Sequence, residues 1–217
     1  MTRRCVVLLG GSFDPVHNGH VAIANYFVRL LMPDELRIIP AGNPWQKAPL
    51  QASPGDRVEM IRKAFEKQPV PVTIDQQELR RNGASYTIET LHAARDELGK
   101  DTSIVFLLGA DQLHQLDSWR EWDKLFELAH ICAASRPGFA LEDRAIPAKV
   151  AREFSRRAAN ADQIRNTPHG LTYLAQNLAI DVSATQIRSA LRRGERPGSQ
   201  VPAGVLDYIQ QHHLYQS

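Results

Sequence analysis

The sequence predicts an α/β fold: a doubly wound, Rossmann-like parallel sheet with helices on both faces, giving three layers, α/β/α. Two observations predict it. Short apolar runs alternate with amphipathic stretches of helical length, which is typical of β-α units joined by right-handed crossovers. The runs are also apolar at consecutive positions instead of at every second one, as expected for strands that are buried on both faces.

The predicted strands are aliphatic or β-branched segments bounded by turn residues. The five main ones are Cys5–Leu9, Leu36–Ile39, Val70–Ile74, Ile104–Leu108 and Ile131–Ala134. Two further short strands are predicted near the end, Leu171–Leu174 and Leu178–Ile180.

The predicted helices lie between these runs and after them. They are Gly19–Leu31, Pro54–Lys67, Ser85–Leu98, Trp122–Leu128, Ala184–Arg193 and Gly204–His212. Pro54 at a helix start and Gly99 after a helix end follow the usual asymmetry of helix boundaries. Ala145–Arg165 is expected to form one exposed helix, whose arginines belong to a solvated face.

Composition indicates one globular domain, residues 1–217, with a C-terminal helical portion from about 181 to 217. A chain with 43% hydrophobic residues can bury a core, and a net charge of +2 argues against a nucleic-acid partner. The first apolar run, Cys5–Leu9, is too short for a signal-peptide core or a membrane span. A cytoplasmic protein with no membrane partner is expected, and a homo-oligomer stays open.

The first candidate site follows the first strand, where residues 10–20 read GGSFDPVHNGH directly before a helix. Glycine at the end of a buried strand lets the backbone approach a ligand, and a helix N-terminus attracts anions. His17 and His20 can share one face of the first helical turn and donate together to a phosphate. The spacing matches neither GxGxxG nor GxxxxGKS/T. The alternative is a tight turn with two capping or core histidines, but the coincidence of features favours a phosphate site.

A second candidate helix start lies near the other end of the chain, where residues 181–188 read DVSATQIR. Ser183 is a natural N-cap, and Thr185 adds another hydroxyl. Arg188 follows within about one turn and can hold a phosphate in forked geometry. Taken alone, this motif fits an ordinary capped surface helix equally well.

Together, the HxGH core of the first motif and the SATQIR stretch resemble the nucleotidylyltransferase superfamily. Its members bind a nucleoside triphosphate and transfer its nucleotidyl group to an acceptor phosphate. The usual second motif is Ile-Ser-Ser-Thr-x-x-Arg, and this chain departs from it at Val182 and Ala184 while keeping Ser183, Thr185 and Arg188. The two motifs alone do not choose the acceptor.

Three further stretches are similar to the bacterial nicotinate-nucleotide adenylyltransferase branch. The first runs from DQQE at residues 75–78 through GASYT at 83–87 and leads into Thr90 and Leu91. The second is LGAD at 108–111 followed by Trp119, and the third is SRPG at 135–138. The resemblance covers nearly the whole chain and weakens between Phe139 and His169. Residues 43–47 read NPWQK, whereas the family often has Asn-Pro-Pro-His-Lys, so this chain keeps Lys47 and has Gln46 in place of the family histidine.

The resemblance implies transfer of the adenylyl group of ATP to nicotinate mononucleotide, giving nicotinate adenine dinucleotide and pyrophosphate in NAD biosynthesis. The acceptor phosphate would attack the α-phosphorus in line, without a covalent enzyme intermediate. His17 and His20 would be the catalytic residues and donate to the α-phosphate. Mg²⁺ is expected, bound through the ATP phosphates and not by a protein metal site.

The resemblance also implies two groups of binding residues. Those for ATP are Gly11, Ser12, Phe13, Lys47, Gly109, Asp111, Arg136, Ser183, Thr185 and Arg188. Those for the nicotinate nucleotide are Asn43, Thr87, Trp119 and Arg120. Gly109 and Asp111 would lie near the ribose and Arg136 near the adenine. Trp119 would stack on the pyridine ring, while backbone N–H groups near Thr87 and Arg120 would receive the carboxylate.

Other functions stay open at this point. A pantetheine-phosphate adenylyltransferase or a cytidylyltransferase is the alternative within the superfamily, although the SYT stretch and Trp119 argue against both. A fragment of a class I aminoacyl-tRNA synthetase would share HxGH, but the chain has no room for a tRNA-binding domain. A sensor that binds a nucleotide without turnover would not need a charge clamp at the α-phosphorus.

Overall fold

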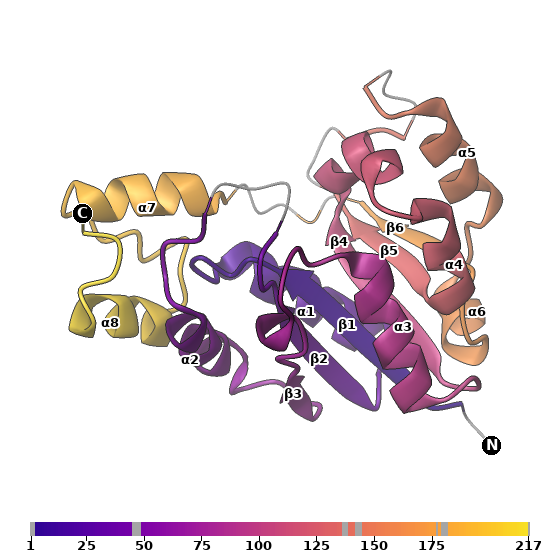
Figure 1. Ribbon diagram of the computed structural model, residues 1–217, viewed down its shortest axis with the longest axis horizontal. Helices are drawn as coiled ribbons and strands as arrows, with labels where there is room; N and C mark the ends of the chain where they lie inside the picture. Colours follow the sequence, from indigo (N-terminus) through magenta and orange to yellow (C-terminus); the bar gives the residue numbers. More distant parts are fainter. Residues whose placement is uncertain are drawn as a thin grey trace.

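A computed structural model describes residues 3–44, 49–135, 139–141, 145–176, 178 and 182–216 of the chain. Within these residues, six strands form one sheet in the order β3-β2-β1-β4-β5-β6, and all neighbouring strands are parallel (Figure 1). The strands are β1 (Cys5–Gly11), β2 (Glu35–Pro40), β3 (Val72–Ile74), β4 (Ser103–Gly109), β5 (His130–Ala134) and β6 (Thr172–Ala175). The predicted doubly wound parallel sheet is confirmed.

Each of these strands falls on a predicted apolar run, with ends that shift by at most about two residues, as boundaries usually do. The strand predicted at Leu178–Ile180 is not seen: Leu178 lies in no described strand, and residues 179 and 180 lie outside the described part.

The helices follow the predicted alternation. They are α1 (Asn18–Leu31), α2 (Pro54–Phe65), α3 (Thr87–Leu98), α4 (Leu125–Leu128), α5 (Ala148–Arg156), α6 (Ala161–Asn166), α7 (Ala184–Arg192) and α8 (Ala203–Gln211). Short 3₁₀ segments occur at η1 (Glu78–Arg80), η2 (Ala110–Ser118) and η3 (Trp122–Lys124). None of the described helices is long and apolar enough to cross a membrane.

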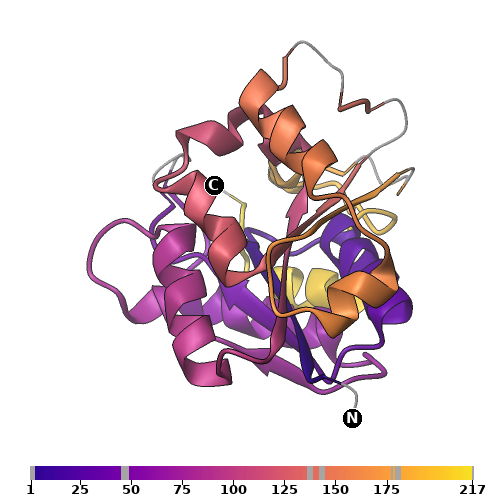
Figure 2. The ribbon, with the colours of Figure 1, turned by 90° about the vertical axis from the view of Figure 1, so that its right-hand side faces the viewer.

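The side chains of β1 alternate between two apolar clusters, one on each face of the sheet. Val7 and Leu9 join the cluster built with α1, α2 and α6, whereas Val6 and Leu8 join the cluster built with α3, α4 and α5. Figure 2 shows α3 and α4 on one side of the strands and α1 and α6 on the other. The predicted three-layer arrangement is therefore confirmed.

The last two helices extend the α1 side of the molecule. Val205, Leu206 and Ile209 of α8 are buried in the same cluster as Met60 and Ile61 of α2, and the two helices pack together. Figure 1 shows α7 beside α8, with the C-terminus next to them. The C-terminal helix α8 therefore packs against an element from the first third of the chain.

The single exposed helix predicted at Ala145–Arg165 is wrong in two respects. The segment forms two helices, α5 and α6, because Asn160 caps α6 by accepting from the Gln163 N–H at 2.9 Å, and Gln163 bonds back to the Asn160 N–H. It is also amphipathic, since Val150 and Phe154 are buried.

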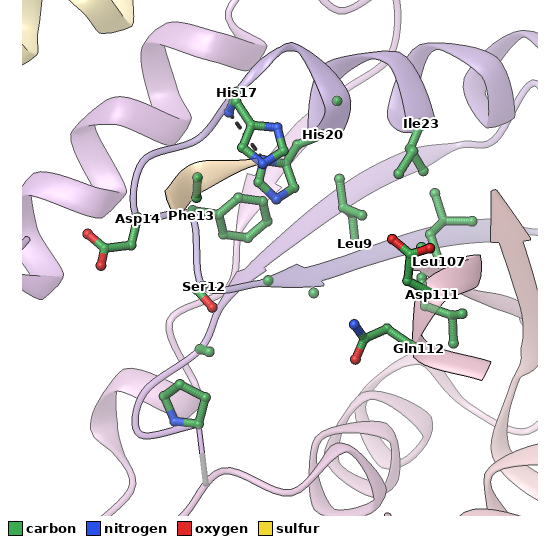
Figure 3. A pocket seen from close by; sticks show the side chains of 18 of the residues that line it. Leu9, Ser12, Phe13, Asp14, His17, His20, Ile23, Leu107, Asp111 and Gln112 are labelled. Atoms are coloured by element: carbon green, nitrogen blue, oxygen red, sulfur yellow. Dashed lines mark hydrogen bonds between the residues drawn. The ribbon is translucent and has the colours of Figure 1, made fainter. Parts of the chain in front are cut away.

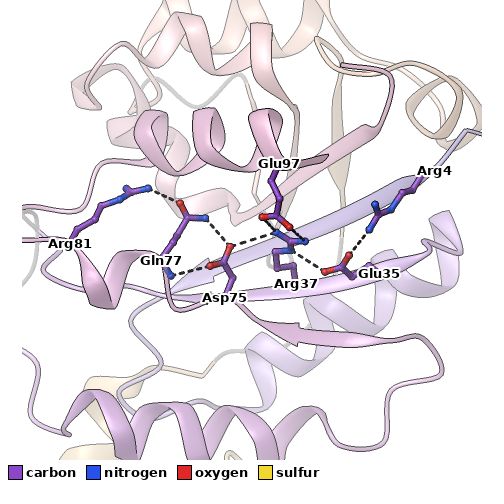
Figure 4. Close-up of polar contacts among 7 residues, drawn as sticks. All are labelled: Arg4, Glu35, Arg37, Asp75, Gln77, Arg81 and Glu97. Carbon is purple, nitrogen blue, oxygen red and sulfur yellow. Dashed lines mark hydrogen bonds and ion pairs between the residues drawn. The ribbon is translucent and has the colours of Figure 1, made fainter. Parts of the chain in front are cut away.

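An arginine lies inside the apolar strand β2, and only 5% of its surface is exposed. Arg37 donates to Glu35 at 3.0 Å and, through both terminal nitrogens, to Glu97 of α3 at 2.7 and 3.0 Å (Figure 4). Asp75, directly after β3, lies 3.8 Å away. Opposite charges and forked hydrogen bonds offset the cost of burying these groups, so the network holds α3 against the sheet.

Candidate active site

The candidate site is a cavity of about 730 Å³ at the carboxyl ends of β1 and β4. The order of strands reverses between these two strands, because the chain proceeds from β1 to β2 and β3 on one side and to β4, β5 and β6 on the other. Open parallel sheets bind ligands at this switch point. The volume lies within the range of pockets that hold small-molecule ligands.

Two glycines form the floor of the cavity where β1 ends. A Cβ on Gly10 would lie 3.3 Å from the Phe106 ring, and one on Gly11 would lie 3.1 Å from the Phe13 ring. Phe13 is buried and has a φ of 50°, a left-handed conformation that turns its ring back beneath the strand end. The turn therefore depends on both the missing Cβ atoms and this buried ring.

His17 and His20 lie at the first turn of α1, as the sequence predicts, and both line the cavity. Their rings stack with centroids 3.7 Å apart, and the His20 ring also lies 4.8 Å from that of Phe13. The His17 backbone N–H donates to Nδ1 of His20 at 3.2 Å, as drawn in Figure 3. Because Nδ1 accepts, a neutral His20 carries its proton on Nε2, which is a donor.

The second motif lies on the same cavity, so residues from both ends of the chain meet there. Ser183, Thr185 and Arg188 all belong to the wall. Ser183 is the N-cap of α7 as predicted, although within the described residues its side chain makes no capping hydrogen bond. Arg188 donates to the carbonyl oxygen of Asp14 at 2.6 Å and to the Thr185 hydroxyl at 3.3 Å.

The end of β4 forms the wall opposite the histidines. Figure 3 shows Asp111 and Gln112 across the cavity from the imidazole rings, and both residues line it. Gly109 is the last residue of β4, and a Cβ there would meet nothing within 4 Å. Among the described residues, therefore, no close contact and no left-handed backbone conformation requires a glycine at position 109, where the space beside the backbone is open.

The remaining wall is formed by the start of α3 and the end of η2. Thr87, Trp119 and Arg120 line it, as does Tyr86. Thr87 is the first residue of α3, where backbone N–H groups point out of the helix end and favour an anion. Arg120 donates to Glu89 at 3.0 Å and lies 5.1 Å above the Tyr86 ring, which places its charge at the rim.

Three of the implied site residues are not part of the described wall. Asn43 is bonded beside it: its N–H donates to the Ser85 hydroxyl at 3.2 Å, and its carbonyl accepts from the Ser85 N–H at 3.0 Å. Lys47 and Arg136 lie outside the described residues. The structure brings the other candidates together around one cavity, and their individual roles stay predictions.

Two carboxyl groups at the cavity, the buried one of Asp14 and the half-buried one of Glu78, were not assigned a function from the sequence. Asp14 is held by several donors, and Glu78 accepts from the Thr90 hydroxyl at 2.7 Å. Burial raises the pKa of the Glu78 carboxyl, and its hydrogen bonds with Thr90 and Ser85 oppose that rise. Asp14 belongs to the first motif, so the sequence could place it near the site. Nothing in the spacing of the motif predicts its hydrogen-bond partners.

A metal site built by the protein is not seen in the part of the chain that the structure describes. No group of three or more His, Cys, Asp or Glu side chains is arranged there to hold an ion. Backbone N–H groups, hydroxyls and Arg188 instead provide donors, which suit phosphate oxygens.

Fold and site together define a nucleotide-binding α/β protein of the cytidylyltransferase-like class, and the model of the Cytidylyltransferase-like family matches residues 8–190. A curated "Probable nicotinate-nucleotide adenylyltransferase" of Herminiimonas arsenicoxydans is 67% identical over 99% of this chain and 98% of its own length. One from Laribacter hongkongensis is 40% identical, covering 100% and 97%. The chain therefore belongs to the nicotinate-nucleotide adenylyltransferase family, whose members are nucleotidyltransferases. The resemblance predicted from its motifs is confirmed.

A solved structure supports the fold. Plasmodium falciparum nicotinic acid mononucleotide adenylyltransferase, in a complex with NaAD, superposes with a TM-score of 0.74 and covers 98% of each chain. The sequence identity is 17%, so this likeness shows the shared Rossmann-like architecture.

Proposed function

We propose that the chain transfers the adenylyl group of ATP to nicotinate mononucleotide, releasing pyrophosphate and giving nicotinate adenine dinucleotide for NAD biosynthesis. One observation carries the proposal: the stacked histidines of the first motif and Arg188 of the second, from opposite ends of the chain, line a single cavity that also contains Trp119. Membership of the family supports the choice of acceptor.

The reaction is an in-line displacement at phosphorus. An oxygen of the acceptor's phosphate attacks the α-phosphorus, the bond from that phosphorus to the bridging oxygen breaks, and pyrophosphate leaves with the electron pair. No side chain forms a covalent intermediate. Catalysis of this kind depends on positioning and on neutralising charge at the transferred group. His20, with its proton on Nε2, and His17 beside it supply donors toward the α-phosphate.

The departing phosphates are assigned to α7 and to Lys47. Ser183 and Thr185 offer hydroxyls at a helix N-terminus, and Arg188 adds a fixed positive charge. Lys47 is proposed to add a second one. The donor-rich wall fits an ATP·Mg²⁺ complex in which the ion is held by the phosphates, and bound Mg²⁺ would neutralise charge on the leaving pyrophosphate.

The nicotinate end is assigned to the start of α3 and the end of η2. Trp119 provides a flat face for the pyridine ring, and the N–H groups near Thr87 and Arg120 are proposed to receive the carboxylate. N–H donors match a carboxylate better than an amide, whose NH₂ group would oppose them. We therefore expect preference for the acid form.

The test is pyrophosphate release from ATP and Mg²⁺, with nicotinate mononucleotide, nicotinamide mononucleotide and phosphopantetheine offered in parallel. Fast release with the nicotinate form alone would support both the reaction and the carboxylate pocket. Equal rates with the amide would keep the reaction and reject the account of selectivity. Release only with phosphopantetheine would refute the proposed function. The absence of release with all three acceptors would refute it as well.

A further inference from the structure

A single buried residue, Asp14, joins four segments of the chain beside the cavity through its carboxyl group and its main-chain oxygen. Only 4% of the residue is exposed. One oxygen accepts from the Tyr215 hydroxyl at 2.7 Å and from the Ala52 N–H at 3.0 Å, and the other accepts from the Gln51 N–H at 2.8 Å. The Asp14 main-chain oxygen is the acceptor for Arg188. The position of Asp14 therefore fixes where Arg188 is held.

Tyr215 reaches this carboxyl from the end of the chain, just beyond α8. Its ring is buried in the cluster of α1, α2 and α8, and the turn before it is closed by the Leu214 N–H donating to the carbonyl of Ile209 at 3.0 Å. Burial raises the pKa of the Tyr215 hydroxyl, and the Asp14 carboxylate raises it further. The hydroxyl thus remains a donor throughout the neutral range.

A buried arginine of α2 bonds to the same turn that contains Asp14. Arg57 of α2 is 1% exposed and donates to the carbonyl oxygen of Ser12 at 2.8 Å. Burial lowers the pKa of its guanidinium, and attraction to the Asp14 carboxylate opposes this. The positive charge of Arg57 compensates a carboxylate that would otherwise be costly to bury.

These contacts hold both sides of the phosphate end of the cavity. Ser12 and Asp14 are the turn between β1 and His17, while Arg188 is the cation of α7. We propose that Tyr215 is a positioning residue for the adenylyl transfer: by donating to Asp14, it holds the Ser12–His17 turn and Arg188 in register for ATP. Tyr215 does not line the cavity, so it acts through Asp14 and not on substrate.

The inference rests on the proposed function and predicts an asymmetric defect. Tyr215 is bonded to the phosphate end, whereas Thr87, Trp119 and Arg120 lie on separate elements. Losing its hydroxyl should lower kcat by about 10-fold or more and weaken ATP binding, because small misplacements at a reacting phosphate are costly. The KM for nicotinate mononucleotide should stay within about twofold, since no contact at that end changes.

The experiment compares Tyr215→Phe with Tyr208→Phe. Tyr208 is a matched control, because it lies in the same C-terminal segment and also donates to an aspartate, Asp56, at 2.9 Å. Asp14 lines the cavity, whereas Asp56 does not. Both substitutions keep the ring. For each chain, kcat and both KM values are measured well below the unfolding midpoint and corrected for the folded fraction, and the ATP Kd is measured by calorimetry.

The expected result is a loss of kcat and ATP affinity in Tyr215→Phe alone, with unchanged KM for the acceptor. Wild-type values in Tyr215→Phe, or equal defects in both variants, would overturn the inference. If the wild type binds ATP but releases no pyrophosphate, the proposed function fails, and the ATP Kd still decides the positioning role. Equal ATP affinity in wild type and Tyr215→Phe would then reject it.

Discussion

The two ends of the parallel sheet both carry polar residues but use them differently. At the carboxyl ends of β1 and β4, glycines, His17 and His20 surround a cavity. Toward the amino ends of β2 and β5, Arg37 and His130 are buried and bonded to other protein groups. The polar residues at the carboxyl end line a cavity, whereas those at the amino end are buried and bonded within the protein. The first arrangement suits a ligand and the second stabilises the fold.

The comparison predicts that substitutions at the carboxyl end cost activity and spare stability. The largest effect is expected for His20→Ala, which removes the Nε2 donor assigned to the α-phosphate. We expect kcat to fall by about 10²–10³-fold, as for loss of a donor that stabilises charge in the transition state. Steady-state pyrophosphate release and thermal unfolding measure the two properties.

His92→Ala is the control for this substitution, since His92 is an exposed histidine on α3 away from the cavity. Its turnover should match that of the wild type. A His20→Ala chain that unfolds at a much lower temperature, with turnover reduced only in proportion to its folded fraction, would erase the distinction between the two ends.

At the amino end, Arg37→Met should show the reverse behaviour. The substitution removes one of the two arginines bonded to the buried Glu35 carboxylate, leaving Arg4 at 2.9 Å, and frees Glu97. Removing one member of a buried ion pair typically costs about 3–5 kcal/mol, and because Arg4 still pairs with Glu35, the free energy of unfolding in urea should fall by an amount near the lower end of that range. The KM values at low temperature should not change, because none of these residues lines the cavity.

The double variant Arg37→Met with Glu35→Gln provides a control within the same network. Neutralising Glu35, which has then lost one of its two arginine partners, should restore part of the lost stability. If the single variant is as stable as the wild type, then the network does not hold α3 on the sheet, and the proposed division of roles is wrong.

His130 offers a pH-dependent test of the same end. Burial lowers its pKa to about 4, although its bond to the Thr167 carbonyl opposes that shift, and the nearby charges of His169 and Arg95 lower it further. The neutral ring accepts from the Leu171 N–H at 3.1 Å and contacts the Thr167 carbonyl at 2.9 Å. The folded state therefore requires neutral His130, whereas the unfolded state binds a proton below about pH 6.5.

Because the folded pKa is depressed, the stability advantage is complete above about pH 6.5 and is lost as the pH falls toward 4. The full loss is on the order of 3 kcal/mol. Urea unfolding at several pH values should show the stability difference between wild type and His130→Gln shrinking over this window. Parallel curves for the two proteins would contradict a neutral, buried His130.

The same contrast explains how far the sequence predicts the molecule. Strands and helix starts are local patterns, and GGSFDPVHNGH is a continuous motif, so the doubly wound parallel sheet and the position of His20 at a helix start follow from short stretches of sequence. Tyr215 and Asp14 are about 200 residues apart, and a lone tyrosine after a helix has no spacing that names a partner. The break before α6 was readable, since Asn160 and Gln163 form a capping box.

Within the cavity, a finer comparison separates the phosphate end from the nicotinate end. The end proposed to hold the phosphates lies next to buried groups such as Asp14 and Arg57, while Trp119 and Arg120, proposed for the nicotinate end, are more exposed. Trp119→Ala should therefore raise the KM for nicotinate mononucleotide by about 10-fold, the size of a lost aromatic contact, and leave the ATP Kd unchanged. Trp119→Phe keeps a flat ring and should lose much less.

The measurement is a pair of saturation curves, one for each substrate, on both Trp119 variants. A rise in KM for the acceptor alone would assign the pyridine ring to Trp119. Tyr215→Phe is expected to show the opposite pattern, with weaker ATP binding and an unchanged KM for the acceptor. Equal losses for ATP and acceptor would mean that the two ends of the cavity are mechanically coupled. The buried contacts of Asp14 would then position the whole active site instead of its phosphate half.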